Sequence, residues 1–189
     1  MNISRLDSLE RSQKELPIVK KELARLAKGL SSSLTYHSVS HTEDVIHEVL
    51  LFGLKDGIEE RELHLLVIAA CFHDSGFLVK PMANEPIGAE FAAMAMETGS
   101  EYSTDEISLV SQMILDTEII FGPGGPEFKS SGLLSGYLLD ADLSNFGRED
   151  FFEKSKLFAE ETNQSVDELK PSMIDFSKNT TGIPWRPKT

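Results

Sequence analysis

Cysteine is nearly absent from this sequence, which contains a single one, Cys71, in 189 residues. One cysteine cannot form a disulfide bond within the chain, so a small fold held together by disulfides is excluded. Cys71 lies inside an apolar run, where a thiol ordinarily serves as inert packing. Such cysteine usage fits a reducing compartment, and we expect the protein to be cytoplasmic.

Basic residues are also scarce. The chain has 18 Lys and Arg against 31 Asp and Glu, which gives a formal net charge of −13 at pH 7. A surface this acidic repels nucleic acid and anionic membranes, and we expect neither as a partner. It also repels phosphate esters. Any site for a phosphorylated ligand would therefore need the local positive charge of a metal ion.

Long apolar runs and strand-like alternation are missing as well. The apolar run Leu65–Phe72 is too short for a membrane span, which needs about 20 residues. The first residues lack the apolar segment of a secretory signal. No stretch alternates with the two-residue period of a strand over a useful length. These absences favour an all-α fold without a membrane-spanning segment.

Helical periodicity, by contrast, extends through most of the chain. Apolar residues recur at helix spacing from Leu6 to Leu30, where Pro17 interrupts the pattern or begins a second helix. At this length, with 40% hydrophobic residues, the chain can form one domain, which we place at residues 1–170, with a polar tail at 171–189. Further helices are expected over residues 37–52, 59–73, from 84 onwards, 103–119, 133–146 and 149–169, the one at 103 opening with a capping box of Ser103 and Glu106.

One segment, Phe121–Gly132, contains four glycines and two prolines and predicts a loop, which could act as a lid over a site. It is not a phosphate-binding P-loop. The Gly-Lys-Ser/Thr ending is missing, and prolines remove backbone amides that such a loop uses to hold phosphate.

The pair His73-Asp74 follows directly on the apolar run. An imidazole and a carboxylate are both costly to bury without a partner. A divalent metal ion would satisfy both, because neutral histidine and ionised aspartate are standard ligands. The ordinary alternative is a helix end at which His73 bonds to a carbonyl and Gly76 closes the helix.

Two other segments carry residues of the same type. His37 and His41 are four residues apart and would share one face of a helix. Asp142 falls in the middle of the apolar stripe of its predicted helix, whereas Asp140 falls on the opposite side. If one of the two aspartates binds a metal ion, this geometry favours Asp142. Asp140 would then be a solvated or capping carboxylate.

The order His41, His73-Asp74, Asp142 resembles the HD-domain metal-dependent phosphohydrolase superfamily, which is named for the adjacent His-Asp pair. The resemblance covers residues 34–157. The segments Tyr36–His41 and Ala141–Asn145 are similar to the cyclic-nucleotide phosphodiesterase branch. Other segments, Phe72–Phe77, Asn84–Ala89 and Gly147–Phe152, are similar to small bacterial HD proteins of unassigned substrate.

This resemblance implies a single HD-domain helical bundle of about six or seven helices. Its metal ligands would be His41, His73, Asp74 and Asp142, holding one divalent ion of manganese, iron, nickel, cobalt or magnesium. Asp74 would also orient the attacking water, and His37 would protonate the leaving oxygen. The implied activity is hydrolysis of a small phosphate ester such as a nucleotide, by an enzyme of phosphodiesterase or nucleotidase type. Without the resemblance, His37 would equally be a surface residue at the start of a helix.

Two other functions are weighed against this one. In guanosine tetraphosphate hydrolases an Arg-Leu-His-Asn sequence follows the last aspartate; here Leu143-Ser144-Asn145 takes its place, which disfavours that activity. The other is a non-catalytic module that keeps the metal ion as a structural staple and senses a nucleotide. Asp116-Thr117 falls where many relatives place a histidine, so a fully ligated second metal site is not expected.

The remaining charged and histidine residues have simpler interpretations. His47 and His64 are expected at the surface. Lys80 and Arg148 are the candidate cations for contacts to phosphate. Glu85 resembles a family glutamate near the metal site, although a place in the first turn of a helix already explains an acidic residue.

Overall fold

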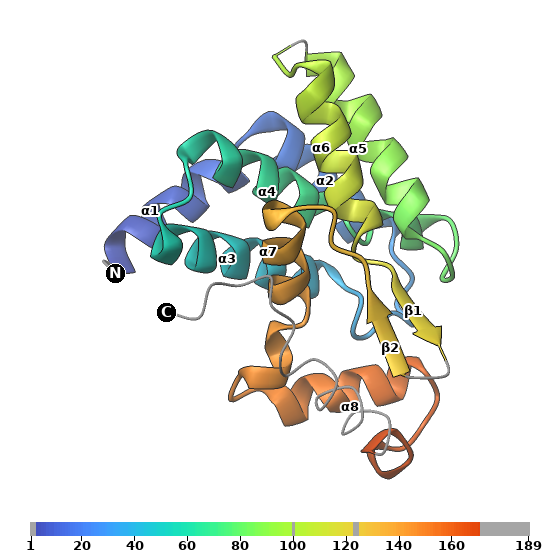
Figure 1. Ribbon diagram of the computed structural model, residues 1–189. Coiled ribbons are helices and arrows are strands. Elements are labelled where there is room, and N and C mark those ends of the chain that lie inside the picture. The colour runs from blue at the N-terminus through green and yellow to red at the C-terminus, as the bar shows by residue number, and fades with distance from the viewer. Residues whose placement is uncertain (1–2, 100, 123–124, 171–189) are drawn as a thin grey trace.

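A computed structural model describes residues 3–99, 101–122 and 125–170. The predicted tail at 171–189 lies outside the described residues. The architecture is all-α apart from one small hairpin (Figure 1). The helices are α1 (Ile3–Lys14), α2 (Pro17–Gly29), α3 (Val39–Asp56), α4 (Glu60–Phe72), α5 (Glu85–Gly99), α6 (Thr104–Leu115), α7 (Leu133–Asp142) and α8 (Phe151–Glu161), with 3-10 turns η1 (Ser75–Leu78) and η2 (Ser144–Gly147).

These eight labelled helices exceed the expected six or seven because the first apolar stretch divides in two. Pro17 begins α2 at the first helical position, where its missing N–H costs nothing and its fixed φ suits the helix. The predicted capping box is confirmed at the start of α6, where the Ser103 hydroxyl accepts from the Glu106 amide and the Glu106 carboxylate accepts from the Ser103 amide.

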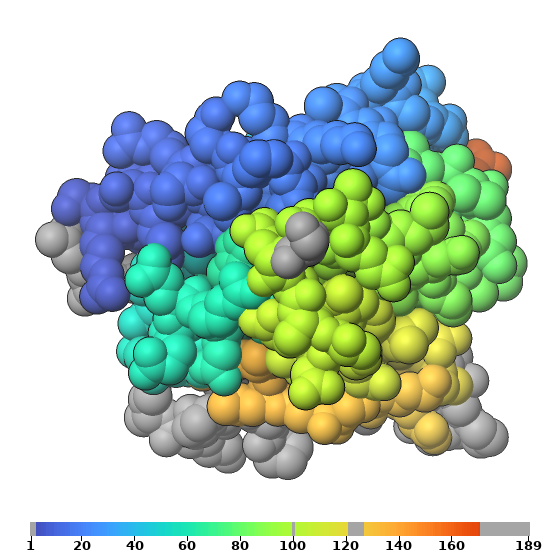
Figure 2. All heavy atoms as spheres, turned by 90° about the horizontal axis from the view of Figure 1, so that it is seen from above, coloured from blue at the N-terminus to red at the C-terminus, as the bar shows by residue number. Residues whose placement is uncertain are grey.

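Helix α4 forms the centre of the bundle. Every residue from Leu65 to Phe72 is at most 2% exposed, as expected for a helix that is apolar all round. The helix contacts α2, α3, α5, α6 and α7. Seen from above, α1 and α2 cover one side of the molecule, and α5 and α6 lie next to them (Figure 2). The end of α4, where His73-Asp74 follows, is therefore enclosed by other helices.

The segment expected as a structureless loop contains a β-hairpin, and that prediction was wrong in this respect. Strand β1 (Ile119–Gly122) pairs antiparallel with β2 (Gly125–Phe128), with Ile119 opposite Phe128. Each strand has only four residues, and these include glycine and proline. The sequence therefore shows no alternation of apolar and polar residues in this segment. A two-stranded ribbon tolerates Pro126 because both of its strands are edges.

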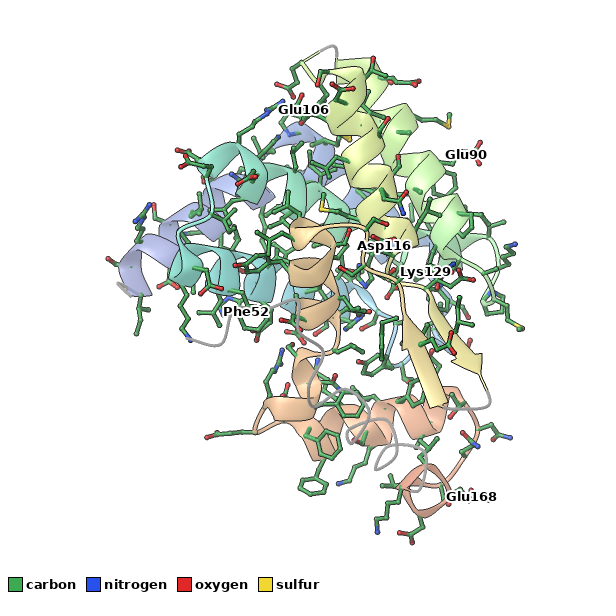
Figure 3. The ribbon with its side chains drawn as sticks, in the orientation of Figure 1. Phe52, Glu90, Glu106, Asp116, Lys129 and Glu168 are labelled. Carbon is green, nitrogen blue, oxygen red and sulfur yellow. The ribbon has the colours of Figure 1, made fainter. Side chains whose placement is uncertain are left out.

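The hairpin is joined to the helical bundle through Asp116, a buried residue at the end of α6. Both the amide and the hydroxyl of Ser131 donate to its carboxylate, at 2.7 and 3.0 Å. Figure 3 labels Asp116 where the end of α6, the hairpin and the start of α7 meet. These bonds hold the segment between β2 and α7 against the end of α6.

Several helices end earlier than expected. Helix α6 ends at Leu115 instead of 119, because strand β1 begins at Ile119. Helix α7 ends at Asp142 instead of 146, and the 3-10 turn η2 follows. Helix α8 ends at Glu161 instead of 169. As a result, Asp142 and Glu161 are both the last residues of their helices.

Among the described residues, none of the helices combines the length and the hydropathy needed to cross a bilayer.

Candidate metal centre

Three of the four residues predicted as metal ligands, His41, His73 and Asp142, come together in the bundle, and Asp74 lies beside the two histidines. His41 lies in the first turn of α3, His73 and Asp74 connect α4 to η1, and Asp142 ends α7. His41 and His73 are buried, at 5% and 1% exposure. His41, His73 and Asp142 form a group whose potential ligand atoms all lie within 4.8 Å of one another. Asp140 is not a member of that group.

The contacts within this group are short. His41 Nε2 lies 2.9 Å from Asp142 Oδ1 and 3.4 Å from His73 Nε2. His73 Nε2 lies 3.5 Å from Asp142 Oδ1. Asp74 adds a fourth potential ligand atom, because its Oδ2 lies 3.2 Å from His73 Nε2 and 3.5 Å from His41 Nε2. Asp74 thus lies against both imidazoles, while the ligand atoms that are all close to one another are those of His41, His73 and Asp142.

These distances fit a divalent cation. Ligand atoms about 2.1 Å from a common ion lie roughly 3.0 Å apart in octahedral and 3.4 Å apart in tetrahedral geometry, and the five contacts range from 2.9 to 3.5 Å. Asp74 Oδ2 is buried and has no hydrogen-bond partner. An orphaned carboxylate oxygen is costly in the interior, and a bound cation would satisfy it.

His73 shows how the helix end serves this centre. Its Nδ1 donates a hydrogen bond to the Ala70 carbonyl at 2.8 Å, which leaves Nε2 directed at the other ligand atoms. A histidine that binds a metal ion is ordinarily oriented in this way. The hydrogen bond from His73 to a backbone carbonyl, expected at an ordinary helix end, is therefore present. Because it uses Nδ1, it leaves Nε2 able to act as a metal ligand.

Charge is strongly coupled within the group. Burial alone would raise the pKa of the Asp142 carboxyl, but hydrogen bonds from His41 and His73 hold that pKa well below its ordinary value. Burial alone would lower the pKa of His73, but the charge of Asp74 and the bond to Asp142 raise it well above its ordinary value. The carboxylates around His73 therefore favour positive charge at this point, whether as a proton on His73 or as a cation.

Two glycines bring the start of α5 against this centre. A Cβ on Gly76 would overlap the backbone of Asn84. A Cβ on Gly88 would lie 2.6 Å from the Phe72 carbonyl oxygen and 3.0 Å from that of His73. Both positions therefore require glycine, because only glycine permits such close backbone approach. The first turn of α5, which begins with Glu85, is held beside His73-Asp74.

His37 lies next to the centre, but outside the helix on which it was expected. Helix α3 begins at Val39 after an extended N-cap residue, Ser38, so His37 precedes the helix. Its ring nevertheless lies 6.0 Å from that of His41, centroid to centroid, and stacks on Phe77 at 4.4 Å. The Nδ1 atom of His37 pairs with the carboxylate of Glu161.

Glu161 fixes both the position and the charge of His37. Its Oε2 accepts from the backbone amides of Tyr36 at 2.8 Å and His37 at 3.0 Å. Burial alone would lower the pKa of His37, but the bond to Glu161 and the nearby charge of Asp74 raise it above its ordinary value. The imidazole is thereby stabilised in its protonated form, with Nδ1 committed to Glu161.

A cavity of about 230 Å³ opens beside these groups. One wall is formed by Asp74 and Asp142 and another by the segment between η1 and α5. In that segment Ala83 has a positive φ of 50°. Such backbone is rare for alanine and concentrates at functional sites. The hairpin contributes one residue. The lining residues are His37, Asp74, Phe77, Pro81, Ala83, Asn84, Glu85, Thr117, Ile119 and Asp142.

Other residues singled out in the sequence lie elsewhere. Arg148 pairs with Asp150 and lies within 3.5 Å of Asp44 and Glu48, so its guanidinium is engaged by carboxylates outside the cavity lining. Lys80 is exposed and does not line the cavity. Their predicted contacts to phosphate therefore have no support in this geometry.

The two remaining histidines differ from each other. His47 bonds to Glu10 and its side chain is 41% exposed, in keeping with a surface position. The surface prediction for His64 was wrong. Its Nδ1 bonds to Gln13 and its Nε2 to the Tyr102 hydroxyl, each at 3.0 Å, in a partly buried contact between helices.

A polar network that was not predicted from the sequence lies behind the centre. Glu22, in α2, is 4% exposed and accepts a hydrogen bond from the Ser75 hydroxyl at 2.5 Å. Arg25 donates twice to the same carboxylate, at 2.7 and 2.6 Å. Because Ser75 follows Asp74 directly, this network ties α2 to the turn that carries a candidate ligand. The one feature of the sequence that could have indicated this network is Glu22, a glutamate on the inward face of α2.

Compared with protein-family models, with curated proteins and with solved structures, the chain shows no match. Function therefore has to be inferred from the site itself.

The two aspartates of α7 provide a direct test of the centre. We expect Asp142→Asn to lose most of its bound metal, because the carboxylate lies 2.9 Å from His41 Nε2. Asp140→Asn should retain it, since Asp140 lies outside the group of potential ligands. Elemental analysis of the two folded variants measures the difference. Equal loss in both folded variants would mean that the register of the helix, and with it the choice of Asp142 over Asp140, is wrong.

Proposed function

We propose that this protein is a metal-dependent phosphohydrolase of the HD-domain superfamily. The observation that carries this proposal is the meeting of three features at one cavity. The first is a group of three potential metal ligands, His41, His73 and Asp142, with Asp74 beside both imidazoles. The second is a buried oxygen of Asp74 that makes no hydrogen bond, and the third is His37, whose imidazole pairs with Glu161 beside the cavity. The substrate would be a small phosphate ester such as a nucleotide.

A divalent cation held by His41, His73, Asp74 and Asp142 would polarise a phosphoryl oxygen and lower the pKa of a water molecule. Manganese, iron, nickel, cobalt and magnesium are all compatible with two imidazole and two carboxylate ligands. The carboxylate of Asp74 lines the cavity and is a suitable acceptor for a proton of the attacking water.

His37 would supply the proton for the leaving oxygen. Because Nδ1 is paired with Glu161, Nε2 is the nitrogen that can deliver a proton. Glu161 would hold the imidazole in this orientation and stabilise its charged form, much as a buried carboxylate does in a catalytic triad. This pair is what favours an enzyme over a module that only senses a nucleotide, because binding alone needs no proton donor.

The partners proposed for this site follow from charge. With a net charge of −13, the surface disfavours nucleic acid and anionic membranes, so we propose a small phosphorylated molecule as the ligand and the cytoplasm as the location. The cavity of about 230 Å³ is smaller than a typical ligand pocket of 300–1,000 Å³. It would enclose the phosphate and the adjoining atoms of the leaving group.

A metal-reconstitution screen tests this function. Chelator-treated protein is loaded with each of the five metals and assayed on phosphate monoesters, phosphodiesters and nucleotides. We expect hydrolysis that depends on the added metal and is lost in Asp142→Asn but kept in Asp140→Asn. Nucleotide binding in a thermal-shift assay, with no turnover on any ester or metal, would favour the sensing module instead.

A further inference from the structure

The charge inside the cavity is unusual for a site that takes a phosphate ester. Its ionisable lining residues are three carboxylates and one histidine, namely Asp74, Glu85, Asp142 and His37. Among the lining residues given for this cavity there is no lysine or arginine, although these are the side chains that proteins ordinarily use to bind phosphate.

Two basic side chains that could have balanced this charge form ion pairs with other carboxylates. Arg148 is engaged by Asp150, Glu48 and Asp44. Lys129, which directly follows β2, pairs with Glu118 at 3.0 Å. The charge of Glu118 is thus balanced by Lys129, whereas within the described part of the chain Glu85 forms no ion pair with a lysine, arginine or histidine.

A charge count identifies Glu85 as the unbalanced group. One divalent cation would offset the two charges of Asp74 and Asp142. The imidazolium of His37 and the carboxylate of Glu161 cancel each other as a pair. Glu85 then leaves one negative charge at the wall of the cavity. Each additional negative charge on a substrate would be repelled by it.

Three observations place Glu85 within electrostatic reach of the centre. The contacts of Gly76 and Gly88 hold the first turn of α5 beside His73-Asp74. The Oε2 atom of Glu85 is buried and has no hydrogen-bond partner. Glu85 also lines the same cavity as Asp74 and Asp142. Its place at a helix N-terminus explains an acidic residue, but not an orphaned oxygen in this cavity.

We propose that Glu85 is a specificity-determining residue that selects substrates by charge, so that the site takes monoanionic phosphodiesters and disfavours dianionic phosphomonoesters and polyphosphates. This inference rests on the proposed phosphohydrolase function. Across a cavity of this size, repulsion between two unit charges corresponds to roughly ten- to hundredfold in binding at an effective dielectric constant of about 20.

The test compares two esters with the same leaving group. Methyl 4-nitrophenyl phosphate is a monoanion, and 4-nitrophenyl phosphate is a dianion at pH 8. Their intrinsic reactivities differ, so the informative quantity is the ratio of their kcat/KM values in wild type and in Glu85→Gln. We expect the monoester-to-diester ratio to rise roughly ten- to hundredfold in the variant. Glutamine keeps the size of the side chain and removes only the charge.

Glu90→Gln is the matched control. Glu90 lies on the same helix, is exposed, and points away from the bundle in Figure 3, so this variant should leave the ratio unchanged. An unchanged ratio in Glu85→Gln would overturn the proposal. Loss of bound metal in Glu85→Gln would also overturn it, because Glu85 would then be a ligand.

A binding measurement separates this inference from the proposed function. Calorimetry on the metal-loaded protein compares inorganic phosphate, a dianion at pH 8, with dimethyl phosphate, a monoanion. We expect Glu85→Gln to favour phosphate over dimethyl phosphate by roughly ten- to hundredfold relative to wild type. If wild type hydrolyses neither ester, the hydrolase function fails, and the binding ratio alone decides the role of Glu85. An unchanged binding ratio would then refute the charge selection.

Discussion

Replacing His73 or Asp74 with alanine should remove the metal ion from the protein. We expect the wild type to carry about one equivalent of divalent metal per chain, as befits one four-ligand site. Each variant should retain less than about a tenth of it, because outer-shell changes alone can cost 10–100-fold in metal affinity and these changes remove ligands themselves. Elemental analysis after gel filtration in metal-free buffer measures the content.

The control for these variants is His47→Ala, which removes a half-exposed histidine paired with Glu10, away from the ligand group. It should keep its metal. Chelation should lower the Tm of the wild type, since an ion that binds only the folded state stabilises it by mass action. The Tm of His73→Ala and Asp74→Ala should not respond to the chelator. Full metal retention in either variant would refute the ligand assignment.

Replacing His37 with alanine should separate proton donation from metal binding. His37 is not among the four ligands, so the variant should keep its metal. On an ester with a poor leaving group, such as an alkyl phosphate, we expect turnover to fall roughly 10²–10⁴-fold, the usual contribution of a general acid. On a nitrophenyl ester the loss should be much smaller, because nitrophenolate departs without a proton.

Glu161→Gln extends this test to pH. Glu161 raises the pKa of His37, and the acid form of His37 is the one needed. Activity on the alkyl ester should therefore fall as the pH rises through that raised pKa. Removing the carboxylate lowers the pKa, so the decline should begin at lower pH in Glu161→Gln. Equal slowing on both esters in His37→Ala, with an unshifted pH profile in Glu161→Gln, would mean that His37 only positions the substrate.

Local signals in the sequence were sufficient to predict that the main helices exist, although several of their ends were misplaced. The apolar run Leu65–Phe72 predicted a buried helix, and that run is the centre of the bundle. The capping box of Ser103 and Glu106 predicted the start of α6. The hairpin at Ile119–Phe128 was missed because four-residue strands rich in glycine and proline carry no periodic pattern.

The candidate site was predicted less completely, because part of it depends on contacts between distant segments. The resemblance to the HD-domain superfamily implied His41, His73, Asp74 and Asp142 as ligands, and helix periodicity favoured Asp142 over Asp140. The fold brings the ligand atoms of His41, His73 and Asp142 together and places Asp74 beside the two histidines. Nothing local marked Glu161 as the partner of His37, because the two are 124 residues apart and His37 lies outside any helix. For the same reason the bond between Ser75 and Glu22 was not foreseen.

The distances along the chain between these groups also determine when the centre can form. His41 and Asp142 are 101 residues apart, and Glu161 follows later still. During synthesis, most of the chain must therefore be made and the bundle closed before the ligands can meet. A metal ion bound by His41 and Asp142 together would therefore not nucleate folding but would enter a bundle already assembled around α4. Its identity would then be decided after folding, by the ions available to the finished molecule.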